Sequence, residues 1–248
     1  MTDAYIVGAV RSAGGKKNGR LSKVHPIDLG AEVVDALVAR TGVPVDEIDD
    51  LIFGCVSQVG AQSSNIARNF CLSSVLGEGV PGTTVDRQCG SGQQAMHFAA
   101  QGVLSGTQDL VIAGGVESMS QVPIGANIID GFKADHGVPY GKKISERYPG
   151  VQFNQFAGAE MLAQKYELTQ DELNQFAFSS HVKAKRAVEE GRFKDEIVPI
   201  EIELEDGSTD MHSQDEGIRF DATLDAISGL QPLQENGLLT AANASQIC

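Results

Sequence analysis

The first 113 residues alternate short apolar runs with longer segments of helical spacing, and this alternation most constrains the fold. The apolar runs lie at residues 4–10, 51–56, 83–85 and 110–113, and the helical segments at 28–42, 65–76 and 93–104. Three such alternations favour a parallel sheet with right-handed crossover connections. The sequence therefore predicts an α/β fold in which a parallel-rich β-α-β-α-β-α-β sheet is layered with helices.

Local signals refine three of these elements. The continuous apolar run at 4–10 predicts a strand that is buried on both faces. Asp28 is the predicted cap of the first helix, which should end at Gly42. The segment 93–104 is apolar nearly all round, so we expect a buried helix with another layer on its far side.

The pattern changes after Gly115. We expect irregular structure at 125–149, helices at 156–166 and 171–190, and a capping box formed by Thr169 and Glu172. Alternating apolar residues predict a strand with one exposed face at 197–204. An acidic, turn-rich stretch follows at 205–216, then a short helix at 222–230 and a return to the core from 238.

Composition excludes several classes of function. The net charge of −14 argues against nucleic-acid binding, although a phosphorylated ligand stays possible. No apolar run approaches the ~18 residues of a membrane span, and the N-terminus lacks the pattern of a signal peptide. Cys55, Cys71, Cys89 and Cys248 form no C-x-x-C pair and no zinc-type cluster. We therefore expect a cytoplasmic protein with reduced cysteines and no metal.

Cys89 is the strongest candidate for chemistry. It lies at the turn between a predicted strand and a predicted helix, where the positive end of the helix dipole favours a thiolate. Gly90 and Gly92 allow a tight turn and leave room for a substrate. The alternative is a small buried residue at a crowded turn.

The other polar candidates are weaker. Glu117 follows a strand and Gly114-Gly115, at the edge of the sheet where ligands bind, but a structural role is the simpler interpretation. No histidine lies in a motif typical of a base that would activate Cys89. His97 is two helical turns from Cys89, so we expect it to pack against other side chains.

Three motifs in order resemble those of the thiolases (acetyl-CoA acyltransferases). They are Val85-Asp-Arg-Gln-Cys-Gly-Ser-Gly-Gln-Gln-Ala95, Ala113-Gly-Gly-Val-Glu-Ser-Met-Ser120 and Thr240-Ala-Ala-Asn-Ala-Ser-Gln246. The similarity runs from Tyr5 to the last residue. The amino-acid sequence around Cys89, together with Asn154-Gln-Phe156, is most similar to the degradative branch of the family that includes steroid-type thiolases.

The resemblance implies a mechanism and a set of ligand contacts. Cys89 would attack a 3-ketoacyl-CoA and keep the shortened acyl group as a thioester, which free CoA then collects; the reverse is a Claisen condensation. The backbone N–H of Cys89 would help to hold the oxyanion. By the same resemblance, Arg219 lies near the adenine end of CoA, and Ser245 and Ala241 lie along its pantetheine.

The resemblance also implies domains and assembly. Residues 1–118 would form the N-terminal core, 119–234 an inserted α+β loop domain that binds CoA, and 235–248 a truncated return to the core. Coenzyme A would be a co-substrate, with no permanently bound cofactor. Relatives of this kind form homodimers or homotetramers.

The departures from the family pattern are substantial. Many thiolases have His-Met-Gly where this chain has Asn154-Gln-Phe156. Residues 1–248 do not include the family's C-terminal domain, which by the resemblance would supply the histidine of a Gly-His-Pro motif and a second cysteine. We expect the chain alone to be inactive. We also expect it to be poorly soluble, because the helix at 93–104, which in the family lies buried between the two halves, would expose a large apolar patch together with the last strand. The hypotheses left open are the N-terminal part of a thiolase, one chain of a split thiolase, and a non-catalytic CoA-binding subunit.

Overall fold

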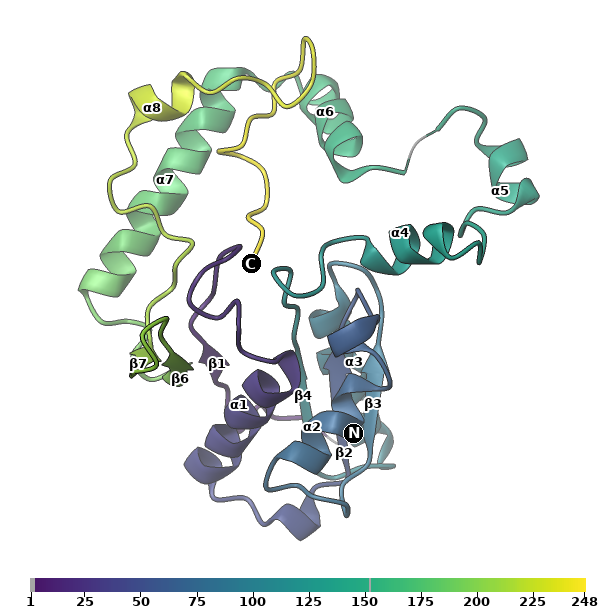
Figure 1. Ribbon diagram of the computed structural model, residues 1–248, viewed down its shortest axis with the longest axis vertical. Helices are drawn as coiled ribbons and strands as arrows, with labels where there is room; N and C mark the ends of the chain where they lie inside the picture. The colour runs from purple at the N-terminus through teal and green to yellow at the C-terminus, as the bar shows by residue number, and fades with distance from the viewer. Residues whose placement is uncertain (1–2, 152) are drawn as a thin grey trace. The chain divides into compact units, whose positions relative to one another are not determined.

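The structure is a computed structural model that describes residues 3–151 and 153–248, and the chain falls into two units. The first unit contains the residues up to His136, Asp195–Asp215 and Cys248. The second contains Gly137–Lys194 and Glu216–Ile247 (Figure 1). These units group residues by contact, so the domain boundaries at 118 and 234 stay a prediction.

A three-stranded parallel sheet forms the centre of the first unit. Its strand order is β3 (Gly82–Val85), β2 (Asp50–Gly54) and β4 (Val111–Gly115). In the register, Leu51 of β2 lies opposite Gly82 on one side and Ile112 on the other. The predicted parallel α/β architecture is confirmed.

Helices cover both faces of this sheet. On one face, α1 (Pro26–Thr41) and α2 (Ile66–Ser73) enclose a core in which the Phe53 and Phe70 rings meet edge to face at 4.9 Å. Side chains alternate along a strand, so Gly54 faces the other way and touches the start of α3 (Ser91–Ser105). The apolar strand residues thus bury one face, and the glycines admit a helix on the other.

The first helix begins differently from the prediction. His25 is its N-cap, because the ring Nδ1 accepts the N–H of Ile27 at 3.2 Å. Pro26 occupies the first helical position, where its fixed φ and missing N–H are tolerated. Asp28 therefore lies inside the first turn. Gly42, with φ +66°, ends the helix as predicted.

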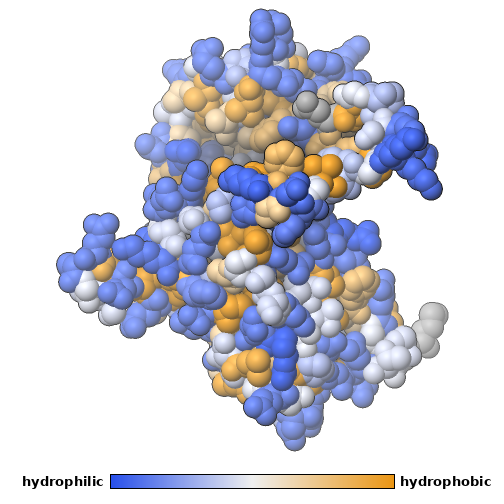
Figure 2. All heavy atoms as spheres, turned by 45° about the vertical axis from the view of Figure 1, so that its right-hand side comes forward, coloured by the Kyte–Doolittle hydropathy of each residue, from blue (hydrophilic) through white to orange (hydrophobic). Residues whose placement is uncertain are grey.

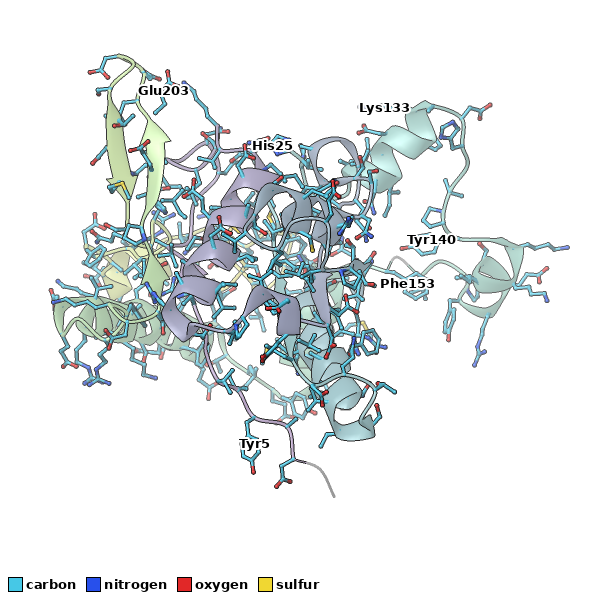
Figure 3. The ribbon with its side chains drawn as sticks, turned by 90° about the horizontal axis from the view of Figure 1, so that it is seen from below. Tyr5, His25, Lys133, Tyr140, Phe153 and Glu203 are labelled. Atoms are coloured by element: carbon cyan, nitrogen blue, oxygen red, sulfur yellow. The ribbon has the colours of Figure 1, made fainter. Side chains whose placement is uncertain are left out.

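The strand predicted at residues 4–10 is wrong. Tyr5 is 78% exposed and projects away from the helices (Figure 3), and only Arg11–Ser12 form a strand, β1. β1 pairs in parallel with β5 (Ile197–Val198). Beside the outer edge of β4 lies a cavity of about 310 Å³ instead of a strand, and Val10 lines it. The apolar run has no ladder to join within the described residues, and an unpaired segment is not a strand.

The helix α3 has no second layer among the described residues, and it exposes the apolar patch that we expect of this chain alone. Its buried residues are Ser91 and Ala95, whereas Met96, Phe98 and Leu104 are each more than 40% exposed. Only the face toward β2 and β4 is packed, and no described residue of the first unit covers the other face. The face of the molecule in Figure 2 carries apolar side chains at the surface among hydrophilic ones.

Two helices occur where irregular structure was predicted. They are α4 (Ala126–Lys133) and α5 (Lys142–Arg147). Gly125, with φ +79°, precedes α4 as its N-cap, so the glycine that suggested a loop instead begins a helix. Only the connection between the two helices is irregular.

A small hairpin completes the first unit. β6 (Ile200–Glu203) alternates buried and exposed residues as predicted, and Pro199 separates it from β5. β7 (Thr209–His212) pairs with it antiparallel, within a stretch that was predicted to be turn-rich. The sequence did not predict β7 because its residues are mostly polar, and it is a strand because it pairs with β6.

The second unit is mainly helical. Its helices besides α5 are α6 (Gln155–Lys165), α7 (Gln170–Glu189) and α8 (Leu224–Ser228). The predicted capping box between Thr169 and Glu172 is present at the start of α7. Near α5, the Tyr140 and Phe153 rings lie 5.4 Å apart (Figure 3). Among the helices of the described residues, none has the length and apolar character needed to span a membrane.

Candidate active site

Cys89 lies in the turn between β3 and α3 and carries an exposed free thiol. The preceding residue, Gln88, has φ +50°, an uncommon conformation for a non-glycine residue. The Ser91 hydroxyl holds the turn: it accepts the Arg87 N–H at 2.9 Å and donates to the Gln88 carbonyl at 2.6 Å. Ser91 thus fixes the backbone of the turn, and the Cys89 sulfur takes no part in these hydrogen bonds.

The start of α3 rests directly on the sheet through three glycines. A Cβ on Gly54 would lie 2.4 Å from the backbone nitrogen of Gly92. A Cβ on Gly115 would lie 3.3 Å from the Cα of Gly92. Side chains at these positions would push the helix away, so the glycines set the height of the Cys89 turn above the carboxyl ends of β2 and β4. The helix begins at Ser91, two residues before the predicted start.

Glu117 is a structural clamp. Its carboxylate accepts the N–H groups of Val56 at 2.8 Å and Ser57 at 3.1 Å, and the Gln62 amide at 2.8 Å. The oxygen of the fully buried Gln62 side chain in turn accepts the Ser118 N–H at 2.6 Å. This network ties the loop after β2 to the loop after β4. The sequence offered no signal for the part played by Gln62.

No histidine among the described residues makes a hydrogen bond to Cys89. His97 is exposed, so the prediction that it packs against other side chains is wrong, because its face of α3 is uncovered. His212 is buried with its Nε2 at 3.1 Å from the Ala13 carbonyl oxygen, and His181 accepts the Arg219 N–H through Nδ1 at 3.3 Å. The described residues thus supply the thiol without a hydrogen-bonded base.

The four thiols divide into two classes. Burial raises the pKa of Cys55 to about 12, with a smaller contribution from the nearby Glu117 carboxylate. Burial also raises the pKa of Cys71. Cys89 and Cys248 are exposed. Buried thiols with a raised pKa are inert toward electrophiles, which leaves the two exposed cysteines as candidate nucleophiles.

The other predicted site residues belong to the second unit. Arg219, Ala241 and Ser245 are all exposed. The Gln246 amide donates to the Gly217 carbonyl at 2.7 Å, which joins the segment of Ser245 to that of Arg219. Their roles in binding stay predictions, as does the role of Cys89.

A second feature of this unit is a cavity of about 340 Å³ at the start of α6. Asn154 caps the helix, because its Oδ1 accepts the N–H of Phe156 at 2.8 Å. Glu160 of α6 is only 3% exposed, and its carboxylate accepts backbone N–H groups of Leu238 and Leu239. The cavity is lined by Asn154, Phe156, Ala157, Glu160, Leu233, Gln234 and Leu239.

Comparison with known proteins places the chain in a family. The thiolase N-terminal domain family matches residues 4–248. A steroid 3-ketoacyl-CoA thiolase, FadA6 of Mycobacterium tuberculosis, is 43% identical over 100% of this chain and 60% of its own length. A 3-ketoacyl-CoA thiolase of Bacillus subtilis is 38% identical over 99% of this chain and 63% of its own length.

The fold agrees with this assignment. The crystal structure of the Bacillus anthracis acetyl-CoA acetyltransferase superposes with a TM-score of 0.81 at 33% identity, covering 99% of this chain and 63% of that one. The chain therefore spans about 60% of the length of the curated relatives it matches. The family match, the identities and the superposed fold together show that the chain belongs to the thiolase family and corresponds to its N-terminal domain.

Proposed function

We propose that this chain supplies the nucleophile and the CoA-binding surface of a thiolase that cleaves 3-ketoacyl-CoA, or runs the reverse condensation. The observation that carries the proposal is the exposed Cys89 thiol at the head of α3, in a turn whose geometry depends on Ser91. A thiol that has no structural hydrogen bond and stands at a helix N-terminus is suited to nucleophilic attack.

In the proposed reaction, the Cys89 sulfur attacks the 3-keto carbonyl of the acyl chain. The bond between the 2- and 3-carbons breaks, acetyl-CoA leaves as its enolate and takes up a proton, and the shortened acyl group stays on the sulfur. The thiol of a free CoA then attacks this thioester and restores Cys89. Backbone N–H groups at the turn would stabilise the oxyanions.

The acid–base groups for these steps are proposed to come from a C-terminal thiolase domain. Residues 1–248 contain no Gly-His-Pro motif, and no described histidine bonds to Cys89. That domain could be part of the same polypeptide or a separate chain. We also propose a cytoplasmic homo-oligomer with CoA as co-substrate and no resident cofactor.

Bromoacetyl-CoA tests the proposal because it combines an alkylating group with the proposed recognition element. The thiolate displaces bromide and forms a stable thioether. We expect Cys89 to react about tenfold faster with bromoacetyl-CoA than with bromoacetamide, and free CoA to suppress the difference. Cys248 is the internal control: it is equally an exposed thiol and should show no preference. Peptide mass spectrometry measures both sites in one sample.

The outcomes separate the hypotheses. Equal preference at Cys89 and Cys248 would overturn the proposed CoA-directed nucleophile. If Cys89 shows no preference between the two reagents but free CoA still slows its alkylation by both, the result would favour the non-catalytic CoA-binding subunit. Separately, acetoacetyl-CoA thiolysis by the chain alone should be far below the typical ~10 s⁻¹ of enzymes; turnover near that value would show that no further domain is needed.

A further inference from the structure

We infer that Glu160 is a positioning residue that holds the backbone of segment 237–246 so that Ala241 and Ser245 can contact the pantetheine part of CoA. The inference rests on the proposed function for its ligand. It is carried by a contact within the second unit that joins α6 to a distant segment without helix or strand.

The Glu160 carboxylate is committed to backbone donors. Its Oε1 accepts the N–H groups of Leu238 at 2.9 Å and Leu239 at 2.8 Å, and its Oε2 accepts that of Leu238 at 3.0 Å. The residue is 3% exposed and forms no salt bridge with a described residue. A buried carboxyl group needs such donors, so the position of the segment and the burial of the Glu160 side chain depend on each other.

The shape of the segment fits this role. A Cβ on Gly237 would lie 2.6 Å from the Glu160 Oε1, so glycine lets the backbone approach the carboxylate. Leu239 and Glu160 both line the cavity at the start of α6. The clamp is therefore one wall of a cavity of about 340 Å³.

The segment then turns under further restraint. The Thr240 N–H donates to Asn243 Oδ1 at 2.8 Å, and the Asn243 N–H donates back to the Thr240 carbonyl at 3.2 Å. Beyond the turn, Gln246 bonds to the Gly217 carbonyl. Glu160 is thus the anchor at the entry to this segment and Gly217 the anchor at its exit, with Ala241 and Ser245 exposed between them.

Glu160→Gln tests the clamp with minimal change of volume. The amide keeps one acceptor oxygen but turns an NH₂ group toward the Leu238 and Leu239 donors. Glu167→Gln is the matched control, because Glu167 follows the same helix and is exposed. We expect Glu160→Gln to weaken CoA binding by at least about tenfold, and a factor of ten corresponds to ~1.4 kcal/mol. The binding of adenosine 3′,5′-bisphosphate should weaken less than twofold.

The two ligands distinguish positioning from a general loss of structure. Adenosine 3′,5′-bisphosphate lacks the pantetheine, so it should not sense the segment at 241–245. An equal loss for both ligands would mean that the substitution disrupts the unit as a whole and would overturn the inference. CoA affinity within twofold of the parent would overturn it as well.

Hydrogen exchange provides a readout that is independent of CoA. In Glu160→Gln, amides of residues 238–243 should exchange at least tenfold faster, whereas those of α7 should not change. If the parent chain binds no CoA but this acceleration occurs, the proposed function fails and the clamp stands. Unchanged exchange at 238–243 would refute the clamp itself.

Discussion

Gly54→Ala is the sharpest test of how the fold positions Cys89. The added methyl would lie 2.3 Å from the backbone carbon of Ser91 and 2.4 Å from the backbone nitrogen of Gly92. Non-bonded carbons prefer about 3.5–4.0 Å, so the head of α3 would have to move by about 1 Å. Both opposing atoms belong to the backbone, and no side chain can rotate away.

The expected cost follows from this collision. Overpacking a well-packed site costs about 1–3 kcal/mol, and we expect the upper half of that range. With an m-value of about 1–3 kcal/mol/M, the urea midpoint of the first unit should fall by about 1 M. The chain has no Trp, so circular dichroism at about 222 nm is the suitable signal for helix content.

The matched control is Gly79→Ala. Gly79 has no heavy atom within 4 Å of a built Cβ and does not have a positive φ, so its stability should change by less than about 0.5 kcal/mol. Gly54→Ala should also abolish the preference of Cys89 for bromoacetyl-CoA over bromoacetamide. A midpoint and a preference equal to those of the parent would refute the argument that the glycine contact sets the Cys89 turn.

Three further predictions concern the thiols, the Asp215 carboxylate and the N-terminal cap of α7. With a dithiobis-nitrobenzoate titration at about pH 8, the native chain should release colour for Cys89 and Cys248 only, because the raised pKa values keep Cys55 and Cys71 protonated; rapid reaction of all four without denaturant would contradict the burial. Burial favours a raised pKa for Asp215, but the hydrogen bonds from Arg11 and Gly14 outweigh it and hold its pKa below the ordinary value. The stability that Asp215 provides is therefore present at neutral pH and is lost as the pH falls through the lowered pKa. Asp215→Asn should reduce the urea midpoint at pH 7 and flatten its acid dependence, and an unchanged profile would count against a stabilising role of the Arg11–Asp215 contact. Thr169→Ala removes the capping box of α7 and should cost about 1 kcal/mol in urea unfolding, whereas no change would show that tertiary contacts alone fix the helix start.

The sheet and its crossover helices could be predicted from the sequence because their signals are local. Strand β2 contains the apolar residues Leu51, Ile52 and Phe53 in succession, and α1 ends at a glycine in the left-handed conformation. The strand expected at 4–10 failed because an apolar run specifies burial only when a neighbouring ladder exists. β7 was missed for the opposite reason: its residues are polar, and its partner β6 makes it a strand.

The candidate site divides in the same way. The location of Cys89 was predictable, since a strand, two nearby glycines and a helix follow one another in the sequence. The contacts that hold the loops and segments around the candidate site could not be predicted, because they join residues far apart in the sequence. Glu117 and Gln62 lie 55 residues apart, and Glu160 and Leu238 lie 78 residues apart. A mid-helix glutamate carries no local pattern that distinguishes a buried backbone clamp from a solvated charge.

The order in which the first unit can fold is set by the partners of β1. The sheet, α1, α2 and α3 all lie between residues 26 and 115, so they can form while the chain is still being synthesised. Arg11, however, bonds to Asp215, 204 residues later. At about 5–20 residues per second, that partner emerges from the ribosome roughly 10–40 s after Arg11. During this interval β1 has neither its β5 partner nor the Asp215 carboxylate, so the N-terminal strand joins the first unit after the sheet and its helices can have formed.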